Sequence, residues 1–408
     1  MNERRRVLFV CRARSSESLR SVEALVALDN VDVVTTDVSS GELLLELART
    51  LRDEHGSLER IVTAQETLLE TVALANEALG LPGLSLAAVR RTLDKLQLKA
   101  TLKAAGLNTP RYDVVTGLEE ARAFAGQIGF PIVLKSVAGS GALATFLVHS
   151  ESDLTRVINC GPFLAEQYIS GQELCIDTIT INNAPQFHSI CCYEPSILAA
   201  VENPETQWSC VMPRDMDPYH DFIEQGLKAI KALNVGNAMT HMEGFIDANG
   251  QTWFTDATLR PAGARIAPML AHAYDIDPYR AWARVAVDGC FDGPWERKYA
   301  VGTIFLRGAG AGTVQQVAGI ERVTEEFNEV LADARWPRIG APRSMTYTGD
   351  GFVTVRHRQT EVVQDALQGI AELIRITYSS GSQLPAATWE HRLQNFRELN
   401  RPAWDQAN

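Results

Sequence analysis

The sequence lacks several features that would place it in familiar classes, and each absence narrows its function. No stretch approaches the roughly 18 consecutive apolar residues of a membrane-spanning helix, so we expect no membrane partner. The net charge is −12, whereas nonspecific nucleic-acid binding depends on clustered Lys and Arg, so we expect no nucleic-acid partner. The composition, with 46% hydrophobic and 22% charged residues among 408, indicates a globular protein with two or three domains.

The cysteines also lack a pattern. The seven are odd in number, scattered, and without the CxxC spacing of common zinc sites. We therefore expect reduced core cysteines in a cytoplasmic protein, and no zinc site. A GxGxxG segment is missing as well, because Cys11-Arg12-Ala13-Arg14-Ser15-Ser16 follows the first expected strand, so no dinucleotide site is implied.

Apolar runs separated by helix-like segments open the chain and predict a βαβ unit with a parallel sheet. Its strands are expected at Arg6–Cys11, Val31–Thr36 and Arg60–Ala64. Ser85 is expected to cap one long helix that starts at Leu86, carries Lys95 and stops at Gly106.

A compact α+β alternation follows, with expected strands at Tyr112–Val115, Pro131–Val137 and Thr145–His149 and helices at Leu118–Ile128 and Glu151–Ile158. Later strands are expected at Phe163–Ile169, Leu174–Ile181, Gln186–Tyr193, Ala300–Leu306, Ser344–Thr348 and Phe352–Arg356, and helices at Glu224–Leu233, Pro278–Val287 and Glu361–Ile374.

Lys135 stands at the end of a buried strand, just before the loop Gly139-Ser140-Gly141. A lysine that leads into such a loop supplies positive charge where backbone N–H groups can hold phosphates. A plain hairpin loop is the alternative interpretation of the glycines.

The stretch Thr240–Ile266 contains the strongest pattern of the chain. Alternating runs flank Asn249-Gly250, which predicts a hairpin with a type I′ turn. Counting outward from that turn places Glu243 opposite Asp256 and His241 opposite Thr258. Like charges about 5 Å apart at Cβ are destabilising unless they are neutralised, and a hard divalent cation with oxygen ligands would neutralise them. The alternative is an exposed hairpin whose acids point into water.

Arg260 lies four residues after Asp256, and the small-residue loop Pro261-Ala262-Gly263-Ala264-Arg265 follows it. Small residues allow the backbone to approach a ligand closely. A cation pair, a phosphate-directed arginine and a tight loop together indicate a nucleotide site.

The order and spacing of these motifs resemble the ATP-grasp superfamily, in particular its carboxylate–amine ligase branch, from about Leu74 to Ile266. The resemblance implies α/β and α+β architecture in three parts: an N-terminal parallel unit (1–90), an ATP-grasp domain (91–295) with a lid at about 108–160, and a C-terminal domain (296–408) that closes the substrate pocket.

The nucleotide-binding residues follow from the resemblance. Asp94-Lys95 looks like the family's first nucleotide-contacting lysine, and Phe130–Lys135 like the second, before a phosphate-covering loop with Ser136, Gly139, Ser140 and Gly141. The segment Glu166, Gln167, Tyr168 and Ile169 resembles the hinge that holds adenine, and Glu173 stands at the ribose-binding position.

The catalytic side of the site is implied in the same way. Glu243 and Asp256 match the two acidic metal ligands, and Thr258 stands at a further metal position. The family usually has Glu at the position of Asp256 and Asn at the position of Thr258. Arg260 matches the arginine that meets the acyl phosphate or substrate carboxylate. The residues expected to border the substrate are Gly263, Ala264 and Arg265. His241 would act as a base or line the pocket.

The resemblance implies an enzyme that uses ATP and Mg²⁺, with Mn²⁺ as a substitute, to join an amino-acid-like carboxylate to an amine through an acyl phosphate. The product would be a dipeptide or peptide natural product, and the enzyme a homodimer. Two alternatives stay open: a carboxylase-type or purine-pathway enzyme that uses bicarbonate or formate, and a non-catalytic ATP-binding protein.

Overall fold

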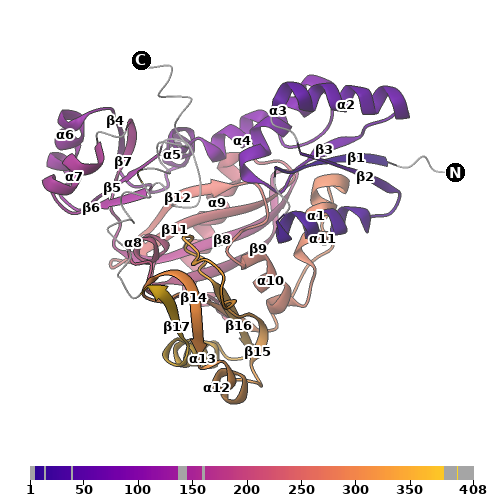
Figure 1. Ribbon diagram of the computed structural model, residues 1–408. Coiled ribbons are helices and arrows are strands. Elements are labelled where there is room, and N and C mark those ends of the chain that lie inside the picture. Colours follow the sequence, from indigo (N-terminus) through magenta and orange to yellow (C-terminus); the bar gives the residue numbers. More distant parts are fainter. Residues whose placement is uncertain are drawn as a thin grey trace.

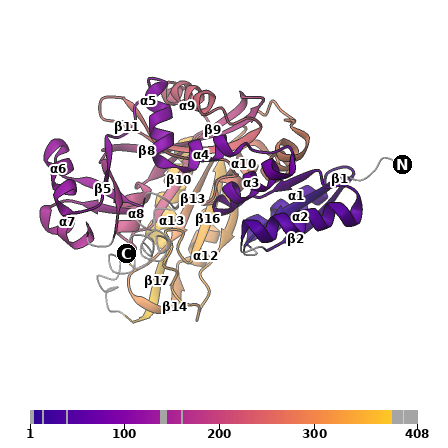
Figure 2. The same cartoon turned by 90° about the horizontal axis from the view of Figure 1, so that it is seen from above.

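The computed structural model describes residues 5–12, 15–37, 40–136, 145–158, 161–380 and 393. Its expected fold class is confirmed: one small parallel sheet and three antiparallel sheets are packed against helices. An N-terminal unit and a small four-stranded unit flank a large central sheet (Figures 1 and 2). Within the described residues, every helix is too short or too polar to cross a membrane.

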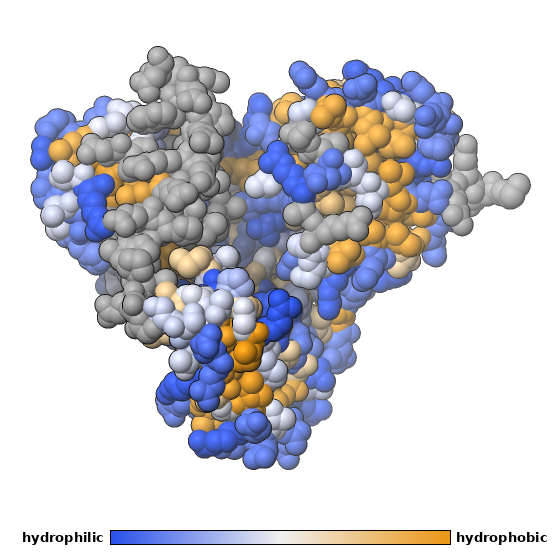
Figure 3. All heavy atoms as spheres, viewed as in Figure 1, coloured by the Kyte–Doolittle hydropathy of each residue, from blue (hydrophilic) through white to orange (hydrophobic). Residues whose placement is uncertain are grey.

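The N-terminal unit is a three-stranded parallel sheet in the order β2-β1-β3, as the apolar runs predict. Its elements are β1 (Arg5–Val10), α1 (Ser16–Val26), β2 (Val31–Thr36), α2 (Gly41–His55), β3 (Arg60–Val62), η1 (Glu66–Leu68) and α3 (Leu69–Leu79). Helices α2 and α3 bury their apolar faces on one side of the sheet, and α1 covers the other. Hydrophobic side chains also reach the surface of this unit (Figure 3). The large exposed ones are Leu19, Val26, Leu43 and Leu74.

Two helices, α4 (Leu86–Leu93) and α5 (Lys95–Ala104), replace the single long helix that the sequence predicts. The Ser85 side chain caps α4, as expected. Asp94 breaks the helix because its backbone is extended and its carboxylate accepts hydrogen bonds from the N–H groups of Leu96 and Gln97. The break starts a new helix at Lys95.

The small unit is a four-stranded antiparallel sheet in the order β4-β7-β5-β6. It contains β4 (Tyr112–Val115), α6 (Leu118–Ile128), β5 (Ile132–Lys135), β6 (Thr145–Val148), α7 (Glu151–Ile158) and β7 (Phe163–Gln167). The helices pack on one face around Phe146 and Phe163, which form an edge-to-face pair. Gly139, Ser140 and Gly141 lie outside the described residues, so the loop expected to cover phosphates stays a prediction.

The central sheet has eight strands in the order β12-β11-β8-β9-β10-β13-β16-β15. Its strands are β8 (Gly171–Ile181), β9 (Ala184–Glu194), β10 (Trp208–Met212), β11 (Ala238–Asp247), β12 (Thr252–Thr258), β13 (Ala300–Leu306), β15 (Leu331–Arg335) and β16 (Gly351–His357). The associated helices are α8 (Ile197–Glu202), η2 (Asp217–Tyr219), α9 (His220–Leu233), α10 (Ile266–Tyr274), α11 (Pro278–Ala283), η3 (Arg284–Asp288), α12 (Ile320–Glu326) and α13 (Thr360–Leu373).

Helices α4, α5 and α9 cover one face of the β8–β11–β12 region, and α10 and α11 cover the other. A two-stranded sheet of β14 (Ala311–Ala318) and β17 (Arg375–Ser380) shares an apolar core with α13. Ser344–Thr348, expected as a strand, is a turn region without strand pairing. The described cysteines are free, as expected, although Cys290 is exposed and not in the core.

Candidate active site

A cavity of about 210 Å³ lies between the small sheet and the β8–β11–β12 edge of the central sheet. It contains nearly all the site residues that the sequence singles out. Those that line it are Lys95, Lys135, Ser136, Glu166, Gln167, Tyr168, Ile169, Glu173, His241, Glu243, Asp256, Thr258, Arg260, Gly263 and Ala264. Residues more than 160 positions apart in the chain therefore line the same cavity.

The β11–β12 hairpin has the expected pairing at the site but not the expected turn. Glu243 pairs with Asp256, and His241 with Thr258. However, Asp247 pairs with Gln251, and only Gly250 of the expected turn pair has a positive φ (77°), so the turn is not type I′. The loop has one residue more than predicted, and a bulge at Thr255 adds one residue to β12, so the two displacements cancel.

Gly244 lies next to the bulge, where the two strands approach closely. A Cβ atom at this position would lie 2.3 Å from the Trp253 carbonyl oxygen, so the strands can approach here only with glycine. The hydroxyl of Thr255 donates to the Glu243 carbonyl oxygen over 3.3 Å and secures the bulge. Glu243 and Asp256 are thereby directed to the same face of the sheet, where both line the cavity.

Three lysines and two acids form an ion-pair cluster at one end of the cavity. Lys135 Nζ lies 2.8 Å from Glu166 Oε2 and 3.0 Å from Asp256 Oδ2, and Lys95 Nζ lies 3.3 Å from Asp256 Oδ1. Burial alone would lower the pKa of Lys135, but the carboxylates of Asp256 and Glu166 outweigh it and raise the pKa. The pKa of Asp256 is lowered in turn, because Lys135 and Lys95 overcome the effect of burial. Both partners are therefore charged at neutral pH.

Lys99 completes this cluster and was not identified from the sequence. Its side chain is fully buried, and Nζ lies 2.7 Å from Glu166 Oε1 and 3.3 Å from the Thr109 hydroxyl. The available signal was its position one helical turn after Lys95, on the same face of α5. Glu166 is thus held by two lysines, which lower its pKa although burial would raise it.

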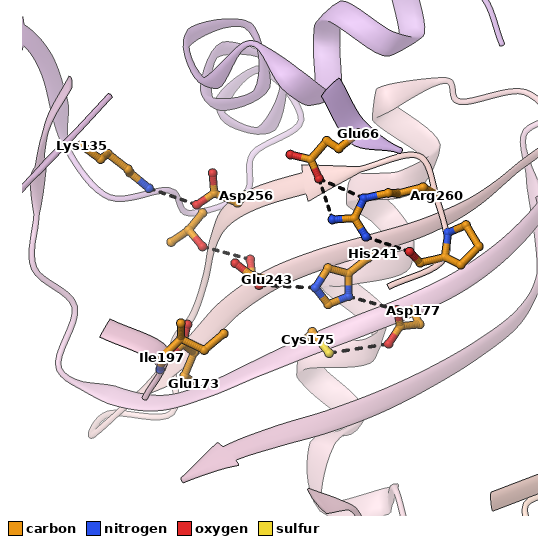
Figure 4. A network of polar contacts seen from close by, with 12 residues as sticks. Glu66, Lys135, Glu173, Cys175, Asp177, Ile197, His241, Glu243, Asp256 and Arg260 are labelled. Atoms are coloured by element: carbon orange, nitrogen blue, oxygen red, sulfur yellow. Dashed lines mark hydrogen bonds and ion pairs between the residues drawn. The ribbon is translucent and has the colours of Figure 1, made fainter. Parts of the chain in front are cut away.

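Arg260 also lines the cavity, and its guanidinium faces Glu66 (Figure 4). Its Nε and Nη2 atoms donate to Glu66 Oε2 over 3.2 and 2.8 Å, and Nη1 donates to the Pro261 carbonyl oxygen over 2.8 Å. Glu66 belongs to η1 and also lines the cavity. Nothing in its local sequence marked it as a site residue.

His241 is held between two carboxylates in the floor of the cavity (Figure 4). Its Nδ1 atom lies 3.0 Å from Asp177 Oδ1, and its Nε2 atom lies 3.4 Å from Glu243 Oε1. Burial would lower the pKa of His241, but Asp177 outweighs it and the pKa is raised well above the usual value. Asp177, on β8, is a further residue that the sequence did not single out.

Glu173 is buried at the opposite wall, where Oε2 accepts a hydrogen bond of 2.6 Å from the Ile197 N–H group. Burial and the nearby Glu243 raise the pKa of its carboxyl to about 8. Gln167 ends β7, and Tyr168 and Ile169 lead from it toward β8, so the expected adenine hinge and ribose position are both found in the cavity wall.

Arg265 does not line the cavity, in contrast to Gly263 and Ala264. Its guanidinium pairs with Asp333 and lies 3.8 Å from the centre of the Phe352 ring. The expectation that Arg265 borders the substrate is therefore not supported. Tyr347, in the segment expected to be a strand, reaches the cavity instead, and the indole N–H of Trp208 donates to its carbonyl oxygen over 2.6 Å.

Comparisons with known proteins identify a matching domain family and a related enzyme. Residues 92–237 match the model of the ATP-grasp domain family. The chain is 24% identical over 268 residues to an L-arginine-specific L-amino acid ligase of Bacillus subtilis, and the alignment spans 63% of each chain, which is less than two thirds of that relative.

Two solved structures show the same fold. The crystal structure of L-amino acid ligase from Bacillus licheniformis superposes with a TM-score of 0.73 at 20% identity, covering 93% of this chain and all of that one. N5-carboxyaminoimidazole ribonucleotide synthetase from Thermotoga maritima gives a TM-score of 0.66 at 17% identity, covering 92% and 100%. The expected resemblance is confirmed: residues 92–237 of this chain match the ATP-grasp domain, and the chain has the fold of these two solved structures.

Proposed function

We propose that this protein is an ATP-dependent carboxylate–amine ligase that activates an amino acid or similar acid as an acyl phosphate. The observation that carries the proposal is the arrangement of charges in one cavity: Lys95 and Lys135 contact Asp256, which is paired with Glu243, and Arg260 lies beyond them. Cations at one end and carboxylates next to them suit a phosphate chain that carries a divalent metal.

The donor set fits Mg²⁺. Glu243, Asp256 and Thr258 offer only oxygen, which is what a hard cation prefers. Thr258 Oγ1 is buried and, within the described part of the chain, has no hydrogen-bond partner, so its lone pairs are available to a ligand. Bound Mg²⁺ would neutralise charge on the β- and γ-phosphates, which is a large part of catalysis in phosphoryl transfer.

The chain's residues would then divide the work between two substrates. Gln167, Tyr168 and Ile169 hold adenine, and Glu173 receives the ribose hydroxyls. Lys95 and Lys135 bind phosphate oxygens, and as their ammonium groups turn to the phosphates, the carboxylate of Asp256 becomes free for the metal. Lys99 remains with Glu166, so this buried acid stays paired when Lys135 is shared with a phosphate.

The acid substrate would meet Arg260. Its guanidinium donates two hydrogen bonds to a carboxylate oxygen, that of Glu66, and this contact supports the assignment of Arg260 to a carboxylate. In the first step the substrate carboxylate attacks the γ-phosphorus and ADP leaves. In the second step the amine attacks the acyl carbon, phosphate leaves with the former carboxylate oxygen, and the ammonium proton is lost to a base.

His241 is the candidate for that base only if its proton can be removed, and its contact with Asp177 favours the protonated ring. We therefore assign His241 the role of orienting Glu243 through Nε2, which lies 3.4 Å from Glu243 Oε1. Tyr347 and Ala264, also in the cavity wall, would border the acyl substrate.

The proposal is tested by measuring ADP and phosphate release from ATP and Mg²⁺ across an array of amino acids, singly and in pairs, with mass detection of products. Turnover that requires a specific pair and yields the mass of the pair minus water is the expected result. Turnover with bicarbonate would indicate a carboxylase instead, and ATP binding without ADP formation under any condition would indicate a binding protein.

A further inference from the structure

Three side chains of a kind that bind transition metals converge beneath the cavity. Cys175 and Asp177 alternate on β8 and so point to the same face, and His241 is the cross-strand partner of Asp177 on β11. Cys175 Sγ lies 3.6 Å from Asp177 Oδ2, and His241 Nδ1 lies 3.0 Å from Asp177 Oδ1 (Figure 4). All three residues are buried, and their ligand atoms lie within 4.8 Å of one another.

We propose that Cys175, Asp177 and His241 form a binding site for Zn²⁺ or a similar borderline-soft divalent ion. Thiolate, carboxylate and imidazole are the ligands that zinc takes in proteins. Ligands about 2.0–2.3 Å from a tetrahedral ion are about 3.3–3.8 Å apart, and the two contacts of Asp177, at 3.6 and 3.0 Å, lie in or near that range. A thiolate is a poor ligand for Mg²⁺, so this site is chemically distinct from the oxygen-only set of Glu243, Asp256 and Thr258.

The surroundings match those of a zinc-bound histidine. A metal-binding imidazole usually donates its second N–H to a carboxylate, and His241 Nε2 lies 3.4 Å from Glu243 Oε1 on the side away from Asp177. Coordination would replace the thiol proton of Cys175 and the Nδ1 proton of His241, and both protons would pass to solvent. The two anionic ligands then balance the charge of the ion within the buried layer.

A second thiol and an entry path lie beside the cluster. Cys191, on β9, is the cross-strand partner of Cys175 and is fully buried. His241 lines the cavity, so an ion can reach the cluster from the cavity floor. The sequence pattern did not reveal this site, because its ligands come from separate strands and not from a CxxC segment.

The test uses the full-length protein purified without chelators. Its zinc content is measured by mass spectrometry, and the metal-free protein is then titrated with Zn²⁺ and with Co²⁺. We expect about one zinc per chain and a cobalt complex with a thiolate-to-cobalt charge-transfer band and the visible bands of tetrahedral cobalt. Zinc uptake well below one ion per chain, or a cobalt complex without the thiolate band, would overturn the proposal.

Variants then assign the ligands. Cys175→Ser and Asp177→Asn should weaken zinc binding at least about 100-fold, whereas Cys192→Ser, on the opposite face of β9, should leave it unchanged. Asp256→Asn should abolish ATP turnover but keep the zinc, which separates this site from the proposed magnesium pair. Full zinc affinity in Cys175→Ser would exclude the site, and should that variant not fold, the cobalt spectrum of the unmodified protein decides.

Discussion

The ammonium group of Lys135, at the end of a strand in the small sheet, lies 3.0 Å from the carboxylate of Asp256 in the central sheet. This contact joins the two sheets at one end of the cavity, so a residue expected to bind phosphate and a residue expected to bind metal contact each other directly. The position of the small unit relative to the central sheet therefore sets the spacing between the charges that would hold ATP.

Lys135→Met should lower ADP formation at saturating ATP at least about 100-fold, because a positive charge at the phosphates is lost. The carboxylates of Asp256 and Glu166 also lose the ammonium group that neutralises part of their negative charge. Lys103→Met, on the exposed side of α5, is the matched control and should retain activity. Activity of Lys135→Met within a few fold of the unmodified protein would contradict the role of Lys135 in phosphate binding.

Lys99→Met should destabilise the protein by about 3–5 kcal/mol, because the buried Glu166 loses one of its two cations. Adding Glu166→Gln in the same chain should recover part of the lost stability, because the neutral amide does not need the positive charge of Lys99. Urea unfolding of the two single variants and the double variant measures the coupling. Strictly additive losses would show that Lys99 and Glu166 act independently.

The pKa of Glu173 gives stability a defined dependence on pH. The folded protein raises this pKa from 4.5 to about 8, through burial and the nearby Glu243, so the proton is bound more tightly in the folded state. The contribution of Glu173 is therefore complete below about pH 4.5 and is lost as the pH rises toward 8. Over that range it amounts to at most about 5 kcal/mol.

Glu173→Gln should remove this dependence, because the amide does not titrate and its oxygen can still accept from the Ile197 N–H group. We expect the free energy of unfolding of the unmodified protein to fall relative to Glu173→Gln between about pH 5 and pH 8. Glu205→Gln, an exposed site, serves as the control. Parallel pH curves for the unmodified protein and Glu173→Gln would show that Glu173 is ionised throughout.

Arg260→Lys should lower kcat/KM for the acid substrate about 10–100-fold while ATP affinity stays nearly unchanged, because an ammonium group cannot reproduce the paired hydrogen bonds of the guanidinium. The comparison is Arg122→Lys on the exposed surface of α6. A loss confined to ATP affinity would place Arg260 at the nucleotide and not at the acid.

Several parts of the fold and site could be predicted because they depend on local patterns. The strand β5 ending at Lys135, the helix α6 at Leu118–Ile128 and the pairing of Glu243 with Asp256 all follow from periodicity and short-range turn signals. The pairing was predicted correctly although the turn type was wrong, because the extra loop residue is offset by the bulge at Thr255.

Residues that reach the site through tertiary contacts could not be predicted. Glu66 meets Arg260 across 194 positions, and Asp177 meets His241 across 64, and neither pair has a local sequence signal. Asp94 was recognised beside Lys95, but its ability to cap a second helix was missed, since Asp is also common inside exposed helical segments. Tyr347 was missed because β-type residues at Ser344–Thr348 lie in a turn region.

The most direct test of the central claim follows an oxygen atom. Once the array identifies the acid substrate, its carboxylate is labelled with ¹⁸O and the reaction is run with ATP, Mg²⁺ and the amine. An acyl phosphate requires one labelled oxygen to appear in the released phosphate for each amide bond formed, and we expect that transfer. Amide formation with unlabelled phosphate would contradict activation of the carboxylate by phosphoryl transfer at the Glu243–Asp256 site.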